Sequence, residues 1–126
     1  MTHDQVQRWL DAYVAAWRSG EAEEISGLFA EHAVYSYRPW ESEEETVRGR
    51  DAIVASWLES PDDPSTWDAE YHPYVVEGNR AVAVGWSRYA PIDDKPERLF
   101  HNAYLLEFDE EGRCSSFHEF YFLEKR

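Results

Sequence analysis

Glu119 is the residue of this sequence whose neighbours most favour acid–base chemistry. It lies between Phe117 and Tyr121 in an aromatic stretch, residues 113–123, with the composition of a closing β-strand. Because side chains alternate across a strand, these three residues are expected to share one face. A carboxylate among apolar neighbours finds a partner, lines a wet cavity, or has a raised pKa. A raised pKa inside an apolar pocket is what a general base acting next to a carbonyl requires.

The same pattern also fits a structural acid. Glu119 could be bonded to Arg88, to Tyr13 or to a backbone group, and a positive charge nearby would oppose the rise in its pKa. Perturbed acids serve structure as well as catalysis, so the sequence leaves both interpretations open.

A metal site and the common nucleophilic sites are not expected. His118 is adjacent to Glu119 and therefore points to the opposite face of the strand, so that His101, His118 and Glu119 do not share one face. Cys114 is the single cysteine and has no evident base beside it. The chain shows no Ser-His-Asp triad, phosphate-binding glycine loop or dinucleotide fingerprint, and we expect neither metal nor cofactor.

Aromatic residues make up 16% of the chain, which is enough to build a core or to line a ligand cavity. Each ring taken alone is more typical of a core, whereas together they favour a partial cavity, since several carry polar atoms that need partners when buried. Trp40 lies in an acidic stretch and could cover the cavity or anchor a loop. The candidate ligand contacts are Trp17, Phe29, Trp40, Trp57, Trp86, Phe117 and Tyr121.

Size and charge narrow the class of protein. We expect the 126 residues to form a single domain, 1–126. The net charge of −14 argues against nucleic acid and anionic membranes as partners, because both are bound through clusters of Lys and Arg. No run approaches the ~20 apolar residues of a membrane helix. The start shows no signal-peptide pattern, and the single cysteine fits a reducing compartment, so we expect a cytoplasmic protein.

The hydrophobic periodicity predicts helices first and then a run of strands. This order argues for an α+β fold in which the helices pack on one face of a bent antiparallel sheet. Pro73 marks a bulge or an edge in its strand, and Gly78-Asn79 is a hairpin signal. The predicted helices are 4–19, 21–29 and 49–60, the predicted strands are 34–37, 70–76, 80–89, 99–108 and 113–123, and 38–48 is predicted as an exposed loop.

Several short motifs follow one another along the chain in a fixed order. They are Tyr13-Val-Ala-Ala-Trp17, Ser19-Gly20-Glu21, Leu28-Phe-Ala-Glu-His-Ala33, Gly49-Arg-Asp-Ala-Ile53, and Phe108-Asp-Glu-Glu-Gly-Arg113 leading into Phe117-His-Glu-Phe-Tyr121. In this order they resemble the SnoaL-like (polyketide cyclase-like) branch of the nuclear transport factor 2-like superfamily. The resemblance covers nearly the whole chain and implies a cone-shaped, curved antiparallel sheet wrapped around three N-terminal helices, with a hydrophobic pocket between them. Members of this superfamily include cyclases, isomerases, epoxide hydrolases, dehydratases and binding or assembly domains.

The resemblance also implies roles for individual residues. Tyr13 matches the tyrosine that donates to the substrate oxygen in ketosteroid isomerases. The two aspartates of those enzymes fall near Tyr37 and Tyr104, where no carboxylate is present, so steroid isomerisation is not expected. Glu119 falls where SnoaL-type cyclases have an acidic residue. The expected catalytic set is therefore Glu119 as base or acid, with Tyr13 or Tyr104 as oxyanion donor.

We therefore expect a small-molecule pocket protein, with an acid/base enzyme (cyclase, isomerase or hydrolase) acting on an apolar, oxygen-bearing substrate as the first hypothesis. The alternatives are a non-catalytic ligand-binding domain and a dimeric assembly domain. We also expect a homodimer through the outer sheet face, because apolar side chains on such a face mark a partner site. The outward residues of the last two strands are His101, Ala103, Leu105, His118, Phe120 and Phe122.

Overall fold

The structure is a computed structural model that describes residues 1–36 and 46–124. Within these ranges the helices are α1 (His3–Ser19), α2 (Ala22–Ser26) and α3 (Arg50–Glu59), followed by a short 3-10 helix (Pro64–Thr66). The strands are β1 (Phe29–Ser36), β2 (Thr46–Arg48), β3 (Trp67–Glu77), β4 (Arg80–Tyr89), β5 (Arg98–Phe108) and β6 (Cys114–Leu123).

Helix α1 is defined at both ends by its own sequence. The Thr2 hydroxyl accepts a hydrogen bond from the backbone N–H of Gln5, and the Gln5 side chain accepts one from the backbone N–H of Thr2. This capping box satisfies two amides that the helix itself leaves unpaired. At the other end Gly20 adopts a left-handed conformation (φ 66°) and donates its N–H to the Ala16 carbonyl. The helix therefore presents a fixed apolar face to the sheet.

The six strands form one curved sheet in the order β2-β1-β6-β5-β4-β3. Consecutive strands from β3 to β6 pair antiparallel, as expected, and β2 pairs antiparallel with β1. The pairing of β1 with β6 is parallel, with Tyr35 opposite Phe117. The antiparallel pairing expected from the sequence is thus wrong for this one pair. Strand β1 joins the sheet beside the last strand, although β2, α3, the 3-10 helix and β3–β5 lie between them in the chain.

Element boundaries differ from the prediction near β1. The second helix ends at Ser26 rather than at Phe29, and β1 begins at Phe29, where a fully buried ring joins the core. The stretch predicted as an exposed loop contains strand β2. The register of β3 against β4 shifts between Pro73 and Val75, as Pro73 predicted. Trp40 lies outside the described residues.

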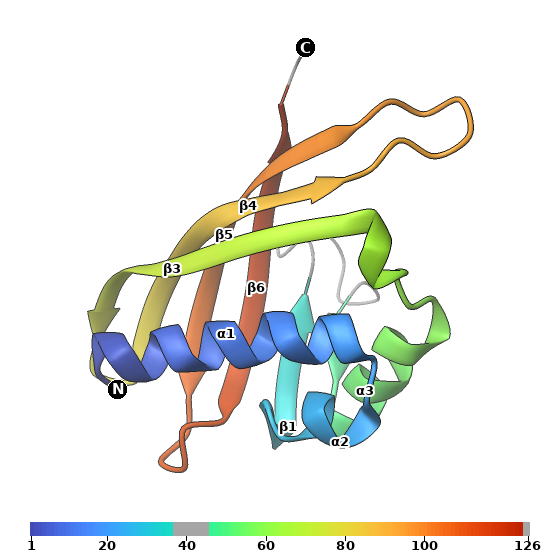
Figure 1. Ribbon diagram of the computed structural model, residues 1–126. Coiled ribbons are helices and arrows are strands. Elements are labelled where there is room, and N and C mark those ends of the chain that lie inside the picture. The colour runs from blue at the N-terminus through green and yellow to red at the C-terminus, as the bar shows by residue number, and fades with distance from the viewer. Residues whose placement is uncertain (37–45, 125–126) are drawn as a thin grey trace.

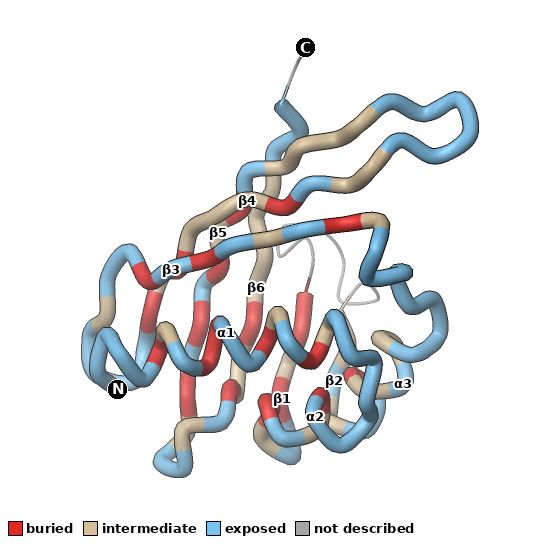
Figure 2. The backbone as a smooth tube through the Cα atoms, in the orientation of Figure 1, coloured by how far each residue is buried: buried red, intermediate tan, exposed pale blue. Residues whose placement is uncertain are grey.

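The three helices gather on the concave side of the sheet, where α1 runs across the strands (Figure 1). Buried residues follow the strands beneath α1, whereas the end of β4, the start of β5 and the end of β6 are intermediate or exposed (Figure 2). Trp9 of α1 packs edge-on against Phe29 and Phe108, and Tyr35 stacks on Phe117 at 4.4 Å between ring centroids. Across the described part of the chain, no helix combines the length and apolarity that spanning a membrane would need.

Candidate functional site

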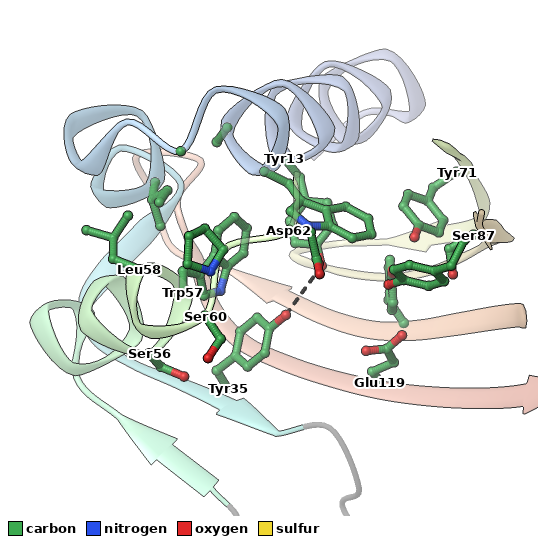
Figure 3. Close-up of a pocket in the computed structure, with 17 residues that line it drawn as sticks. Tyr13, Tyr35, Ser56, Trp57, Leu58, Ser60, Asp62, Tyr71, Ser87 and Glu119 are labelled. Carbon is green, nitrogen blue, oxygen red and sulfur yellow. Dashed lines mark hydrogen bonds between the residues drawn. The ribbon is translucent and has the colours of Figure 1, made fainter. Parts of the chain in front are cut away.

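A cavity of about 160 Å³ lies on the concave side, beyond the packed aromatic core. The second half of α1, the end of α3 with the residues after it, and strands β1 and β3–β6 enclose it (Figure 3). Its lining is rich in aromatic rings and hydroxyl groups. The described residues that supply them are Tyr13, Trp17, Tyr35, Ser56, Trp57, Ser60, Tyr71, Ser87, Tyr89 and Tyr104, and the two charged lining residues are Asp62 and Glu119.

Glu119 is held by a short chain of hydrogen bonds across β4, β5 and β6. The Asn102 side-chain N–H donates to Glu119 Oε2 at 2.7 Å, and the Ser87 hydroxyl donates to Asn102 Oδ1 at 3.1 Å. Ser87 and Asn102 are buried, with 3% and 7% of their surfaces exposed. Because the Asn102 carbonyl is already engaged by Ser87, its amide is oriented to donate to the carboxylate. This arrangement fixes one oxygen of Glu119.

Burial raises the pKa of Glu119 to about 7, against the hydrogen bond from Asn102, which lowers it. Glu119 makes no salt bridge with any described residue. Arg88, the cation that could have neutralised it, is exposed, and its position next to Ser87 in β4 places it on the opposite face of the sheet. The rise in pKa predicted from the aromatic neighbours of Glu119 is therefore the direction found.

Two buried tyrosines, Tyr71 and Tyr104, line the cavity together with Glu119 and carry neutral hydroxyl groups. Tyr71 and Tyr104 are 4% and 1% exposed, and their ring centroids are 4.8 Å apart. Burial raises the pKa of both phenols, and the charge of Glu119 raises them further. Both therefore keep their protons at neutral pH, and side-chain hydrogen bonds join Tyr71 to Tyr104 and to Ser87. Tyr13 is engaged in the same way, because its hydroxyl lies 3.3 Å from the hydroxyl of Tyr35.

Five of the residues named from the sequence line the cavity together, namely Tyr13, Trp17, Trp57, Tyr104 and Glu119. The other described candidates do not. Phe29 and Phe117 are 0% exposed and form the packed core beside the cavity. Tyr121 shares the face of Glu119 but packs against Phe100 further along the sheet. Trp86 pairs with His101 and lies on the outer face, because it alternates with Ser87.

Several cavity residues were missed from the sequence. Tyr71 could have been found, since alternation along the predicted strand 70–76 puts it on the same face as Pro73, which is also buried. Asn102 shares a face with Tyr104 by the same rule. Ser87 and Asp62 carry no local signal, because only the strand register and the path after α3 bring them to the cavity.

The arrangement suits proton transfer to or from a small molecule. A base is most effective when its pKa lies near the working pH, and Glu119 meets that condition. Neutral O–H donors nearby can stabilise negative charge that develops on a substrate oxygen. Among the described residues, no group of three His, Cys, Asp or Glu side chains could hold a metal ion.

Comparison with solved structures supports the fold. An NTF-2 like protein of unknown function from Burkholderia xenovorans LB400 superposes with a TM-score of 0.71 at 16% identity, covering 98% of this chain and 87% of that one. An LEH-like epoxide hydrolase from M. tuberculosis superposes with a TM-score of 0.68 at 12% identity, covering 95% and 84%. No curated protein matches the sequence. The SnoaL-like domain family matches residues 10–117, and the chain belongs to this family.

Proposed function

We propose that this protein takes a small oxygen-bearing molecule into the cavity and that Glu119 transfers a proton to or from it. The observation that carries this proposal is a half-buried carboxyl group with a pKa of about 7, without an ion pair to described residues, that lines the cavity beside two neutral phenols. Half of such groups are ionised near neutral pH, so the protein holds both a base and an acid form there.

The reaction class that fits best is removal of a proton from carbon next to a carbonyl. Ionised Glu119 accepts the proton, and the carbonyl oxygen, which becomes negative, accepts a hydrogen bond from Tyr104 or Tyr71. Isomerisation and ring closure both begin with this step. Hydrolysis of an epoxide, the activity for which the M. tuberculosis neighbour is named, would use Glu119 to activate water instead.

A second candidate is a binding domain without turnover. The cavity of about 160 Å³ is smaller than the ~300–1,000 Å³ typical of ligand pockets, and the predicted donor Tyr13 is already hydrogen-bonded to Tyr35. The same two observations also fit an assembly domain, in which the sheet mediates association and the cavity has no function. Both alternatives require that Glu119 performs no chemistry.

Exchange of hydrogen for deuterium next to a carbonyl tests the proposal without knowledge of the product. Cyclohexanone is incubated with the protein in D2O, and loss of its α-proton signals is followed by NMR. We expect the protein to accelerate exchange, and the rate to rise with pH through about 7 as Glu119 ionises. Glu119→Gln should lose the acceleration, which for a general base is about 10²–10⁴-fold.

Glu110→Gln is the matched control, because Glu110 is exposed in the turn before β6 and should leave exchange unchanged. Equal exchange by the native protein and Glu119→Gln contradicts the proposal. Titration of Glu119 by carbon NMR then distinguishes between the two alternatives, a binding domain and an assembly domain. A pKa near 7 without acceleration favours the binding domain.

A further inference from the structure

The charged groups that line the cavity all have the same sign. Asp62 follows α3 and Glu119 lies on β6, and no Lys, Arg or His occurs among the described lining residues. Asp62 is fixed at the rim, since its Oδ2 accepts a hydrogen bond of 3.1 Å from the indole N–H of Trp17. The whole chain adds a net charge of −14. An anion entering this cavity would meet repulsion, and no described lining residue offers it a counter-charge.

The wall between these two carboxylates is a continuous array of electron-rich rings. Tyr13 is in ring contact with Trp57 (5.3 Å), Tyr71 (6.1 Å) and Tyr104 (5.8 Å). Tyr71 and Tyr104 are themselves in contact, so the rings belong to one cluster that spans α1, α3, β3 and β5. The faces of Trp and Tyr attract cations, most strongly where water is excluded.

The negative field of Glu119 reaches across the cavity. Its charge raises the pKa of Tyr71, Tyr89 and Tyr104, on three neighbouring strands, and burial is the larger cause in each. Asp62 also raises the pKa of Tyr89. The opposing cation is Arg98, whose guanidinium lies over the Tyr89 ring at 5.2 Å but which does not line the cavity. Among the described residues, the charged side chains that line the cavity are therefore both acidic.

We propose that the ligand of this cavity carries a positive charge, as a small protonated amine that lies against the tyrosine and tryptophan rings in the field of Asp62 and Glu119. The inference rests on the proposed function and names its substrate class. The volume of about 160 Å³ admits a group about the size of benzene, since an engineered protein cavity of ~150 Å³ binds that molecule. The ligand is thus a compact amine rather than a long chain.

Binding of a cation is coupled to the ionisation of Glu119. The described titratable groups that line the cavity with Glu119 are the phenols of Tyr13, Tyr35, Tyr71, Tyr89 and Tyr104, together with Asp62 at the rim. Burial raises the pKa of Tyr71, Tyr89 and Tyr104, so these three phenols are neutral near pH 7. The bound amine supplies a counter-charge that no described residue gives to Glu119, and so stabilises its ionised form. By linkage, the substrate's own charge generates the base that the proposed reaction uses.

Three nearly isosteric probes separate charge from shape: benzylamine, benzyl alcohol and benzoate, titrated against the protein by NMR at pH 8. We expect benzylamine to bind about tenfold more tightly than benzyl alcohol, and benzoate not to bind. Glu119→Gln should bring benzylamine and benzyl alcohol to similar affinities, and Asp62→Asn should have a smaller effect because it is exposed. Glu110→Gln, remote from the cavity, should retain the preference.

The pH dependence provides the second readout. Benzylamine stays protonated from pH 5.5 to 8, whereas only about 3% of a carboxyl group with a pKa near 7 is ionised at pH 5.5. The affinity of the native protein for benzylamine should therefore fall by about tenfold or more as the pH is lowered from 8 to 5.5. The affinity of Glu119→Gln for benzylamine should stay nearly constant.

Equal affinities for benzylamine and benzyl alcohol, a preference for benzoate, or no binding of benzylamine at millimolar concentration would each overturn the cation inference. None of these results touches the proton-transfer proposal, which the exchange of cyclohexanone tests with an uncharged ketone. Conversely, a clear preference for benzylamine without any exchange upholds the ligand class and contradicts the chemistry.

Discussion

At the scale of single residues, loss of water around the Glu119 carboxylate outweighs the hydrogen bond that it accepts from Asn102. Moving the pKa from 4.5 to about 7 corresponds to a free energy on the order of 3 kcal/mol. A hydrogen bond such as the one from Asn102 contributes about 1 kcal/mol, or somewhat more to a charged group. Desolvation therefore wins, and the same imbalance that makes Glu119 a competent base costs folding stability when it ionises.

The first prediction concerns Glu119→Gln and the pH dependence of unfolding. The folded pKa lies above the unfolded one, so the favourable contribution of Glu119 is complete below about 4.5 and is lost as pH rises through about 7. Glutamine keeps the shape and an oxygen for Asn102 to donate to. Chemical unfolding should give equal stability near pH 4, and a variant more stable than the native protein above pH 7, by up to about 3 kcal/mol.

The stability of Glu110→Gln should follow the native protein across the same range, since Glu110 is exposed. A variant that is several kcal/mol less stable at pH 8 would show that Glu119 is a structural acid that loses a needed partner. That result would contradict the site described above.

At the scale of elements, the cavity depends on a close approach of β3 to β4. Gly85 of β4 lies opposite Tyr71 of β3. A Cβ added at Gly85 would lie 2.0 Å from the Glu70 carbonyl oxygen and 2.6 Å from Cδ1 of Tyr71. Only glycine leaves room for this backbone and for the Tyr71 ring, which then faces the cavity.

The second prediction is that Gly85→Ala destabilises the fold by about 1–3 kcal/mol or more, because backbone atoms must move apart to accept the methyl group. Thermal or chemical unfolding measures this cost. Gly27→Ala is the matched control, since a Cβ there meets nothing closer than 3.5 Å, and it should be nearly neutral. A neutral Gly85→Ala would mean that the strands separate without cost and that Tyr71 is not held in place.

Much of the element order could be predicted from the sequence, and the reasons are local. The turn at Gly78-Asn79 and the alternation after it fix β4, which runs over the predicted residues 80–89. Helix α1 agrees with its prediction except for one residue at its start. Its periodicity lies within the segment and its caps, Thr2 and Gly20, directly flank it, so a local pattern defines it. The parallel pairing of β1 with β6 depends on residues far apart in the chain, so no local pattern reveals it.

The candidate site could be predicted in part for the same reason. Glu119 was found because an acid in an aromatic strand is anomalous by itself. Trp86 shows the limit, since aromatic character does not reveal which face of a strand turns inward, and Trp86 lies on the outer face. Asn102 and Ser87 read as ordinary polar strand residues until the register of β4, β5 and β6 places them beside the carboxylate.

At the scale of the whole molecule, the two faces of the sheet differ in what covers them. The helices cover the concave face, whereas no described helix packs on the convex face (Figure 1). The convex side of β5 and β6 includes Leu105 and Phe122, which are 42% and 74% exposed. Exposed apolar side chains grouped on one face are typical of a partner site. The net charge of −14 opposes the approach of a second copy at low ionic strength.

The last prediction is a homodimer through this convex face. Analytical ultracentrifugation should show a dimer at micromolar concentration, and its dissociation constant should fall as salt screens the repulsion between two acidic chains. Leu105→Glu should give a folded monomer, because a side chain that is 42% exposed can be replaced without a gap in the core.

Ile92→Glu is the matched control: Ile92 is 46% exposed in the β4–β5 connection, away from this face, and should leave the dimer intact. A native protein that remains monomeric at high salt would contradict the homodimer. A dimer that survives Leu105→Glu but not Ile92→Glu would show that the chains associate through another surface. The native dimer should lose no affinity for benzylamine relative to the Leu105→Glu monomer, because the cavity lies on the concave side of the sheet, opposite the proposed dimer face.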